Sequence, residues 1–489
     1  MLDIVANIIG AQNLATGAEA GKWSRDWTGN YTSNPLAVAR PANAKEVSEI
    51  LKWANDTKTK IVPVSGNTGL SGGTKSDGSL MISTDRMNRI REVRPASRIA
   101  IVEAGVILDQ VHQSVGAHDL IFPLTFGARG SCMIGGVLST NAGGSNVLRY
   151  GNTRDLVLGL EAVLPTGEIL NLMTELHKDN TGYNLKHLLI GAEGTLGIIT
   201  AAVLKLFPKP KAYATAMVAA PSLEGALELL NRLQEATGGR VEAFEYMPRH
   251  YVEYHRQVFK EAKEPFDQPY EVNILVEIAS TMIDECTPLA DGTIPLGATL
   301  ETVLGQLFET GHVLDAVVAQ NQAQRQEMWS RREAAGMMIS TRVPSINTDV
   351  AVPLDKVPTF INRMNAILPE IDPGFMPNLV SHLGDGNVHY SVWPKSQDPA
   401  VHDQILEAVE VLRRHDMLDC LKLVHCHPGS QLQDIRRVKD AINELAHVYA
   451  ELKLLGAGLE YIDVGGGLGV DYDGSGTNYA SSMNYNIEE

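Results

Sequence analysis

The sequence predicts an α+β protein, and the order of its elements near the N-terminus is the reason. In residues 43–56, Val47, Ile50, Leu51 and Ala54 recur with the spacing of one helix face. Short apolar runs typical of strands follow at residues 60–66, 79–84 and 98–106. A glycine-rich turn, rather than a helix, joins the first two of these strands. This order of helix, strand, glycine loop and strand indicates an α+β unit.

Composition places the chain among ordinary globular proteins of two to four domains. Its 489 residues are 44% hydrophobic and 20% charged, and its net charge of -17 argues against a surface for nucleic acid, which needs clustered basic residues. The four cysteines form no CxxC pair and are expected to be free thiols. No apolar run is long enough to span a membrane, and Asp3 replaces the basic start of a signal peptide. We therefore expect a cytoplasmic protein.

The remaining elements of the first half follow from the same rules. Residues 1–14 predict an amphipathic helix, and Asn43 can cap the next helix with Glu46 as its capping-box partner. Residues 107–118 predict a helix, and residues 156–170 predict two strands about a Pro-Thr-Gly turn. The Pro and Lys cluster at 208–211 predicts a domain boundary.

Two later changes of pattern divide the rest of the chain. From about residue 212, long helical patterns at 222–237 and 300–338 alternate with strands at 270–279 and 348–354. From about residue 403, helices and strands alternate as in βα units of a parallel sheet. The expected segments are 1–34, 35–211, 212–402 and 403–489.

Glycine is concentrated in two segments, 63–73 and 127–151. Each alone is typical of a surface loop. Together, with hydroxyl and amide donors nearby, they suggest a cradle for a pyrophosphate, because glycine lets a backbone approach a ligand closely. The donors are Thr68, Ser71, Ser131, Thr140 and Asn141. Neither segment has the GxGxxG spacing of a Rossmann NAD site.

The segments PVSGNTGLSGG, GARGSCMIGGVLSTNAGGSNVLRYG and DNTGYNLKHLLIGAEGTLGIIT resemble the FAD-binding domain of the vanillyl-alcohol oxidase / p-cresol methylhydroxylase superfamily. Within it they are most similar to the D-2-hydroxyacid dehydrogenases, which include D-lactate dehydrogenases, glycolate oxidase D subunits and D-2-hydroxyglutarate dehydrogenases. The resemblance covers about 25–400. It implies a two-subdomain FAD-binding domain at 35–211 and an α+β substrate domain at 212–402.

The resemblance also assigns residues to the cofactor. FAD would be bound without a covalent link, because the loop lacks the histidine of the covalent members. Ile198 or Ile199 would lie beside the adenine or flavin. The residues that would wrap or line the dinucleotide are Ser65, Gly66, Asn67, Thr68, Gly69, Leu70, Gly72, Pro123, Gly130, Ser131, Gly135, Gly136, Asn141, Gly143, Gly144 and Ile198.

A histidine pair in HLGDGNVHY is the candidate metal site. By spacing alone, His382 and His389 are two surface histidines about a good turn sequence, although a turn that folds back could bring their imidazoles together. In metal-dependent members of the same branch, this motif binds a divalent metal such as Zn, Mn or Fe, and Asn387 contacts the substrate. The metal there acts as a Lewis acid on the substrate.

Arg332, in MWSRREAAGMM, is by itself an ordinary charged helix residue. By resemblance it would bind a substrate carboxylate in a bidentate fork. Members that take a dicarboxylate have a Lys where this chain has Asn347. The implied reaction is oxidation of a D-2-hydroxy acid, lactate-like or related, to the 2-oxo acid by hydride transfer to the flavin. A quinone, a cytochrome or an electron-transfer flavoprotein would accept the electrons, and a homodimer is compatible with the sequence.

The catalytic base of this branch lies in a Ser-x-Glu-His-Gly segment whose Glu is the third metal ligand, and no such segment occurs in the sequence. The alternative is therefore an FAD-binding protein without turnover. Residues from about 405 to the end instead resemble an internal piece of biosynthetic arginine decarboxylase, with its phosphate-binding strand and turn in GLEYIDVGGGLG. There, His427, Ser430 and Gly465–Gly467 would bind pyridoxal phosphate. The strands with the Schiff-base lysine have no counterpart, so that activity is not expected.

Overall fold

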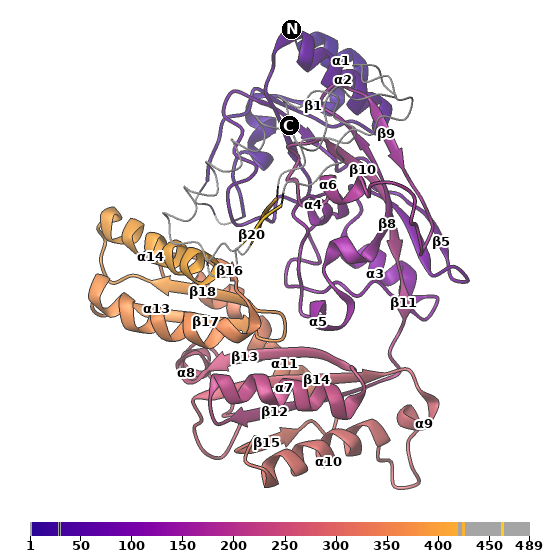
Figure 1. Cartoon of the computed structure of the whole chain (residues 1–489). Helices are drawn as coiled ribbons and strands as arrows, with labels where there is room; N and C mark the ends of the chain where they lie inside the picture. Colours follow the sequence, from indigo (N-terminus) through magenta and orange to yellow (C-terminus); the bar gives the residue numbers. More distant parts are fainter. Residues whose placement is uncertain (1, 28, 30, 419–422, 426–460, 464–489) are drawn as a thin grey trace, which may run out of the picture. The chain divides into compact units, whose positions relative to one another are not determined.

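The computed structural model describes residues 2–27, 29, 31–418, 423–425 and 461–463 (Figure 1). The chain divides into two compact units, Met1–Arg249 with Phe259–Gly336, and His250–Val258 with Met337–Glu489. The mixture of helices with mostly antiparallel sheets confirms the predicted α+β class. No helix among the described residues is long and apolar enough to cross a membrane. The four predicted segment ranges stay predictions.

The first sheet of the first unit is small and has the order β1-β2-β4-β3. Strands β2 and β3 both pair with β4 in parallel, whereas β1 and β2 are antiparallel. Helices α1 and α2 share its core. The elements are α1 (Leu2–Ile9), β1 (Leu14–Ala15), β2 (Ala37–Ala39), α2 (Ala44–Thr57), β3 (Ile61–Val64) and β4 (Leu80–Ser83).

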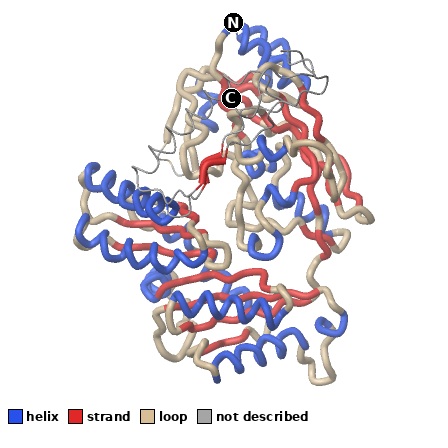
Figure 2. The backbone as a smooth tube through the Cα atoms, viewed as in Figure 1, coloured by secondary structure: helices blue, strands red, loops and turns tan. Residues whose placement is uncertain are grey.

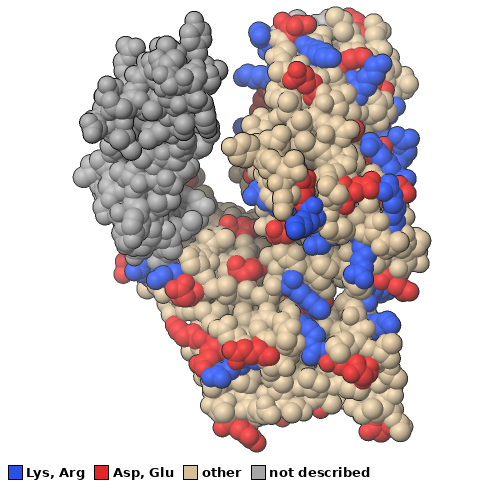
Figure 3. Space-filling model, turned by 45° about the vertical axis from the view of Figure 1, so that its right-hand side comes forward, with Lys and Arg blue, Asp and Glu red and all other residues tan. Residues whose placement is uncertain are grey.

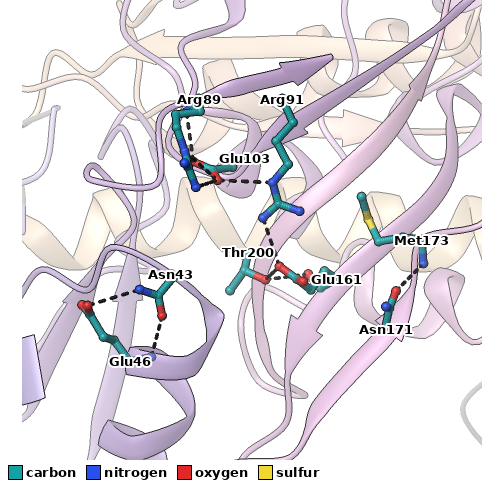
Figure 4. Close-up of polar contacts among 9 residues, drawn as sticks. All are labelled: Asn43, Glu46, Arg89, Arg91, Glu103, Glu161, Asn171, Met173 and Thr200. Carbon is teal, nitrogen blue, oxygen red and sulfur yellow. Dashed lines mark hydrogen bonds and ion pairs between the residues drawn. The ribbon is translucent and has the colours of Figure 1, made fainter. Parts of the chain in front are cut away.

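Helix α2 begins where the sequence predicts it, at a capping side chain. Asn43 Oδ1 accepts a hydrogen bond from the Glu46 backbone N–H at 3.0 Å (Figure 4). The apolar face of Val47, Ile50 and Leu51 is buried. The Glu46 carboxylate reaches back to the N–H of Ala42, one residue before the expected partner. Caps of this kind contribute about 1 kcal/mol.

The second sheet has five antiparallel strands in the order β5-β6-β10-β8-β9. The Pro-Thr-Gly turn joins β8 to β9 as predicted, with Val163 opposite Ile169. Strand β5 was not predicted. The elements are β5 (Ile90–Arg94), β6 (Ile99–Glu103), α3 (Leu108–Gly116), α4 (Ile134–Ser139), α5 (Val147–Tyr150), β8 (Val157–Val163), β9 (Ile169–Leu172), α6 (Lys186–Leu189) and β10 (Ile198–Lys205), with β7 (Leu120–Ile121) paired to β11 (Phe207–Pro208) beside them.

A polar network crosses the neighbouring strands of this sheet (Figure 4). The Glu103 side chain is only 3% exposed and accepts hydrogen bonds from Arg89 Nη2 at 2.9 Å and Arg91 Nε at 3.2 Å. Arg91 also pairs with Glu161, which accepts from Thr200 Oγ1 at 2.7 Å. Burial by itself raises the pKa of Glu103, but the hydrogen bonds from the two arginines outweigh it and hold that pKa below its usual range.

A third set of strands in the first unit pairs in the order β15-β12-β14-β13, and all of these pairs are antiparallel. Apolar residues such as Ala216, Val218 and Val276 are buried in it, and helices α7 and α10 contact β12 (Figure 2). The elements are β12 (Ala212–Ala220), α7 (Leu223–Thr237), β13 (Val241–Pro248), β14 (Val272–Ser280), α9 (Ile283–Cys286), α10 (Pro295–Glu309), β15 (Asp315–Val318) and α11 (Gln322–Glu333).

The long helical pattern expected over 300–338 is wrong as one element. Helix α10 ends at Glu309, Gly311 follows in the left-handed region with φ 77°, and β15 then forms the edge of the sheet before α11 begins. The pairing of β15 with β12 is long-range, so the sheet overrides the local helical spacing.

The second unit contains the antiparallel strand order β17-β18-β16. Its elements are α8 (Arg249–Val258, from His250 on), α12 (Ala335–Ile339, from Met337 on), β16 (Asp349–Ala351), α13 (Val357–Ile371), β17 (Met376–His382), β18 (Asn387–Trp393) and α14 (Pro399–Leu418). Strands β19 (Leu423–His425) and β20 (Tyr461–Asp463) pair in parallel, as the βα pattern predicts. His427, Ser430 and Gly465–Gly467 lie outside the described residues.

Charge is mixed on the face of the molecule drawn in Figure 3. Figure 3 shows acidic and basic side chains interspersed on the described part of one face, without a continuous basic patch there. That nucleic acid is not a partner stays a prediction from the net charge of -17.

Candidate functional site

The first glycine segment is a loop that leaves β3 and is held by its own side chains. Ser65 Oγ lies 2.8 Å from Thr84 Oγ1. Asn67 adopts φ 53°, donates from Nδ2 to the Arg25 carbonyl at 3.0 Å and accepts from Thr74 Oγ1 at 2.8 Å. The Asn67 side chain therefore holds the loop in shape, and both its nitrogen and its oxygen are already hydrogen-bonded.

The backbone of this loop offers a run of donors. Among the residues that the structure describes, no hydrogen bond is made by the main-chain N–H groups from Gly66 to Thr74. Gly69 and Leu70 are exposed. Consecutive backbone N–H groups in a turn form a concave site that favours an anion, without need of Lys or Arg.

The second glycine segment lies directly against the first. A Cβ placed on Gly66 would be 2.5 Å from the Ser131 carbonyl oxygen and 3.1 Å from the Met133 nitrogen, so only glycine lets these two loops meet. A Cβ on Gly144 would likewise collide with the Thr125 carbonyl. The structure thus brings together the two segments that the sequence paired as one cradle.

The other predicted cofactor residues occupy three kinds of position. Gly130, Ser131 and Gly143 are exposed, whereas Pro123, Gly135 and Gly144 are buried beneath them and Gly136 and Gly72 are half-buried. Asn141, at φ 47°, accepts from the Arg154 N–H at 2.9 Å and serves as a turn anchor. The Ile198 side chain is 4% exposed in the core, as is Ile199 at 3%. Their contacts with a cofactor stay predictions.

FAD fits this arrangement. Its pyrophosphate requires hydrogen-bond donors, which the loop from Gly66 to Thr74 supplies, and its rings require close backbone approach, which the glycines allow. Thr68, Leu70 and Gly72 lie in the same loop. No histidine lies in this loop, and binding without a covalent link stays a prediction.

Arg332 lies on α11 and forms a buried ion pair. Its Nε donates to Glu245 Oε2 on β13 at 2.7 Å, and the two side chains are 9% and 1% exposed. Two helical turns earlier on the same helix, Arg325 donates to both carboxylate oxygens of Glu277 on β14 at 2.7 Å. Trp329 Nε1 donates to the Glu277 carboxylate at 2.8 Å. Glu245 and Glu277 are on the same face of the sheet, opposite Leu275 and Ala243 respectively. Two charge pairs therefore hold helix α11 on the sheet.

The histidine pair is brought together by the β17–β18 hairpin in the second unit. His382 lies opposite Asn387, and His389 lies opposite both Val380 and Asp349, so these side chains share one face. The imidazole centroids are 5.1 Å apart with an interplanar angle of 77°. Asn387 Nδ2 donates to Asp349 Oδ1 at 2.6 Å, and His389 Nδ1 is 3.6 Å from the same oxygen. The folded-back turn is confirmed.

A metal does not fit these residues as they stand. Among the residues that the structure describes, no group of three His, Cys, Asp or Glu side chains is placed to hold a metal ion. Asp349 is the nearby carboxylate, but its Oδ1 accepts from Asn387. Two imidazoles without a third ligand are fewer than zinc sites use. The metal predicted at His382 and His389 is therefore not supported, and no step below uses one.

The sequence interpretation missed four carboxylates: Glu242, Glu245, Glu277 and Asp349. The first three are isolated acids in otherwise apolar strands, and each is at most 3% exposed as a residue. A buried acid requires a hydrogen-bonded or charged partner. An isolated acid in an apolar strand could therefore have been recognised in the sequence as a residue with such a partner. Burial raises the pKa of Glu242 above its usual range, against the hydrogen bond from Tyr150 and the charge of Arg149.

Comparison with protein families matches residues 35–173 to the FAD binding domain and residues 209–423 to the C-terminal domain of FAD linked oxidases. The chain is 36% identical over 376 residues to a D-2-hydroxyglutarate dehydrogenase of Xanthomonas citri pv. viticola, with 77% of this chain and 76% of that protein covered. It is 32% identical over 396 residues to a D-2-hydroxyglutarate dehydrogenase of Stutzerimonas stutzeri, with 80% and 82% covered.

Two solved structures share the fold. Alkyldihydroxyacetonephosphate synthase aligns with a TM-score of 0.64 at 16% identity over 85% of this chain and 80% of that one. p-Cresol methylhydroxylase with substrate bound aligns with a TM-score of 0.62 at 15% identity over 84% and 85%. The expected p-cresol methylhydroxylase type of fold is confirmed. The chain belongs to the FAD-linked oxidases, on their D-2-hydroxyglutarate dehydrogenase branch.

Proposed function

We propose that this protein oxidises a D-2-hydroxy acid to the 2-oxo acid with FAD, with D-2-hydroxyglutarate among its substrates. The observation that carries the proposal is the loop from Gly66 to Thr74, whose main-chain donors stand against the second glycine segment. Two relatives named D-2-hydroxyglutarate dehydrogenase, matched over three quarters or more of this chain, supply the substrate class.

The protein's part in the reaction is to hold and orient. The Gly66–Thr74 backbone would bind the pyrophosphate, with Ser131, Gly143 and Gly144 beside the dinucleotide. When bound, the flavin supplies the acceptor for a hydride from the substrate carbon. The two meeting loops fix where that acceptor lies, and orientation of this kind is a large part of an enzyme's rate enhancement.

Arg332 is the proposed partner of the substrate carboxylate. Because Glu245 binds its Nε at 2.7 Å, the plane of the guanidinium is fixed before substrate arrives. A fixed plane reduces the ordering cost of binding a planar carboxylate. Asn387 is the proposed second substrate contact, with its amide oriented by Asp349, which as a carboxylate can only accept.

The neutral side chain of Asn347 is expected to affect which substrates bind, through the group at the far end of the substrate from the 2-hydroxy acid. It is exposed and lies two residues before Asp349, at the start of β16. A lysine at this position would attract a second carboxylate. We therefore propose that the chain also accepts monocarboxylates such as D-lactate, with a smaller preference for the dicarboxylate than lysine-bearing members have.

An anaerobic flavin titration tests the function. The purified protein is mixed with D-2-hydroxyglutarate, D-malate, D-lactate and their L-enantiomers, and the visible flavin absorbance is recorded. Bleaching by D- but not L-acids is the expected result. Bound flavin that none of these acids bleaches would instead support the FAD-binding protein without turnover, which the missing Ser-x-Glu-His-Gly segment favours. A pyridoxal absorbance without flavin would refute both.

A further inference from the structure

Glu242 is a buried carboxylate at an irregular point of β13. Val241 pairs with Ile278 and Ala243 with Glu277, so Glu242 is the extra residue of a β-bulge between them. A bulge redirects the side chain that it inserts, and bulges are frequent next to active sites. The Glu242 residue is 2% exposed.

This carboxylate binds one short segment of the chain, Asn146–Tyr150. Tyr150 donates its hydroxyl to Glu242 Oε1 at 2.7 Å, Arg149 Nη1 donates to the same oxygen at 2.9 Å, and Asn146 Nδ2 lies 3.4 Å from Oε2. Arg149 Nη1 also donates to the Ala279 carbonyl on β14 at 3.0 Å. Three side chains of five consecutive residues thus converge on one acceptor.

The segment itself is short and only partly buried. Helix α5 is four residues long, and none of its residues is fully buried. Its apolar packing comes from Tyr150, whose ring meets Phe207 edge-on with centroids 4.9 Å apart and lies against the core of the second sheet. Short helices are not stable by themselves, so the polar contacts to Glu242 set its position.

The segment continues directly from Gly143 and Gly144 of the cofactor cradle. Gly144 is buried against the Thr125 carbonyl, and the Ser145 N–H donates to that same carbonyl at 3.1 Å. A displacement of residues 146–150 would therefore move Gly144 and Ser145, and with them the cradle. The strand that carries Glu242 also carries Glu245, which holds Arg332.

We infer that Glu242 is a positioning residue that fixes the Gly143–Tyr150 part of the flavin cradle on the sheet of the substrate domain. The inference rests on the proposed binding of FAD by that cradle. On this inference, Glu242 helps to retain the cofactor. Glu245 and Glu277 on the same sheet orient Arg332, the proposed partner of the substrate carboxylate.

The test compares cofactor release with substrate binding in full-length holoprotein. The variants are Glu242→Gln, which keeps the size but removes the charge, and Tyr150→Phe, which removes one hydrogen bond without creating a cavity. Glu235→Gln changes an exposed acid of α7 and is the matched control. FAD release is followed by the fluorescence of freed flavin after dilution, and the KM for a D-2-hydroxy acid is measured separately.

We expect FAD release at least 10-fold faster in Glu242→Gln and about 3-fold faster in Tyr150→Phe, with KM within twofold of wild type, because the Glu245 and Glu277 anchors of α11 are intact. A folded Glu242→Gln variant that releases FAD at the wild-type rate would overturn the inference, as would a KM that rises in parallel with release. If Glu242→Gln does not fold, Tyr150→Phe decides in the same way. The release rate needs no turnover, so a wild type that oxidises no hydroxy acid would refute the proposed function alone.

Discussion

The contact between the two glycine loops at Gly66 gives a sharp prediction, tested by Gly66→Ala. The added Cβ would stand 2.5 Å from the Ser131 carbonyl oxygen, 2.9 Å from Cys132 Cα and 3.1 Å from Met133 N. All three are backbone atoms, so no flexible side chain can turn away to make room. One loop must move relative to the other.

The size of the effect follows from that geometry. Non-bonded heavy atoms are most favourably separated by about 3.5 to 4.0 Å, so relief requires a shift of roughly 1 Å. Overpacking of this kind costs about 1–3 kcal/mol. Because the loop that moves carries the free N–H donors, we expect most of that cost in FAD binding. At 1.4 kcal/mol per tenfold, the Kd for FAD should rise roughly 5- to 100-fold.

The assay is a titration of apoprotein with FAD, followed by quenching of flavin fluorescence. Gly127→Ala is the matched control, because it lies in the second glycine segment, its φ is not positive, and a Cβ there meets no atom within 4 Å. The control should bind FAD as wild type does. Equal Kd values for Gly66→Ala, Gly127→Ala and wild type would refute the reasoning that close approach of these loops builds the cofactor site.

Three further predictions follow from single contacts. Asn347→Lys should lower the KM for D-2-hydroxyglutarate by about tenfold, the effect of one charge-assisted hydrogen bond, and leave that for D-lactate unchanged in steady-state assays. Arg332→Lys should lower kcat/KM by about 10²-fold or more, because Lys cannot make the bidentate fork, and thermal melting should show whether the Glu245 pair was also lost. Burial lowers the pKa of His250 from 6.5 to about 4, so the folded state favours the neutral ring. That stability is fully present above pH 6.5 and is lost as pH falls, by about 2 kcal/mol at pH 5. Urea unfolding at pH 7 and pH 5 checks it, and His250→Gln should reduce the difference.

The elements that the sequence predicted well are those set by neighbours along the chain. The helix cap at Asn43, the Pro-Thr-Gly hairpin and the turn between His382 and His389 each depend on residues within a few positions of one another. The two glycine segments were also recognisable, since so many glycines are costly unless the backbone needs them.

The elements that it missed depend on pairing across long separations. Residues 315–318 lie within the helical pattern predicted over 300–338, yet they form β15 because they pair with the edge of β12. Glu242 and Glu245 were visible as acids in an apolar strand, but their partners Arg149 and Arg332 are 93 and 87 positions away. Sheet register and a single β-bulge decide those pairings, and neither can be read from local spacing.

The sequence by itself therefore determined the α+β class, the glycine loops suited to a pyrophosphate, and the family, because turns, caps and glycine runs are local requirements of the backbone. Only the tertiary structure decided which loop keeps its N–H groups free, which carboxylate fixes Arg332, and that Asp349 lies beside His389. The physical reason is that a buried charge or an unpaired donor is defined by what surrounds it in space. That environment is set by strand register and close packing, which join residues far apart in the chain.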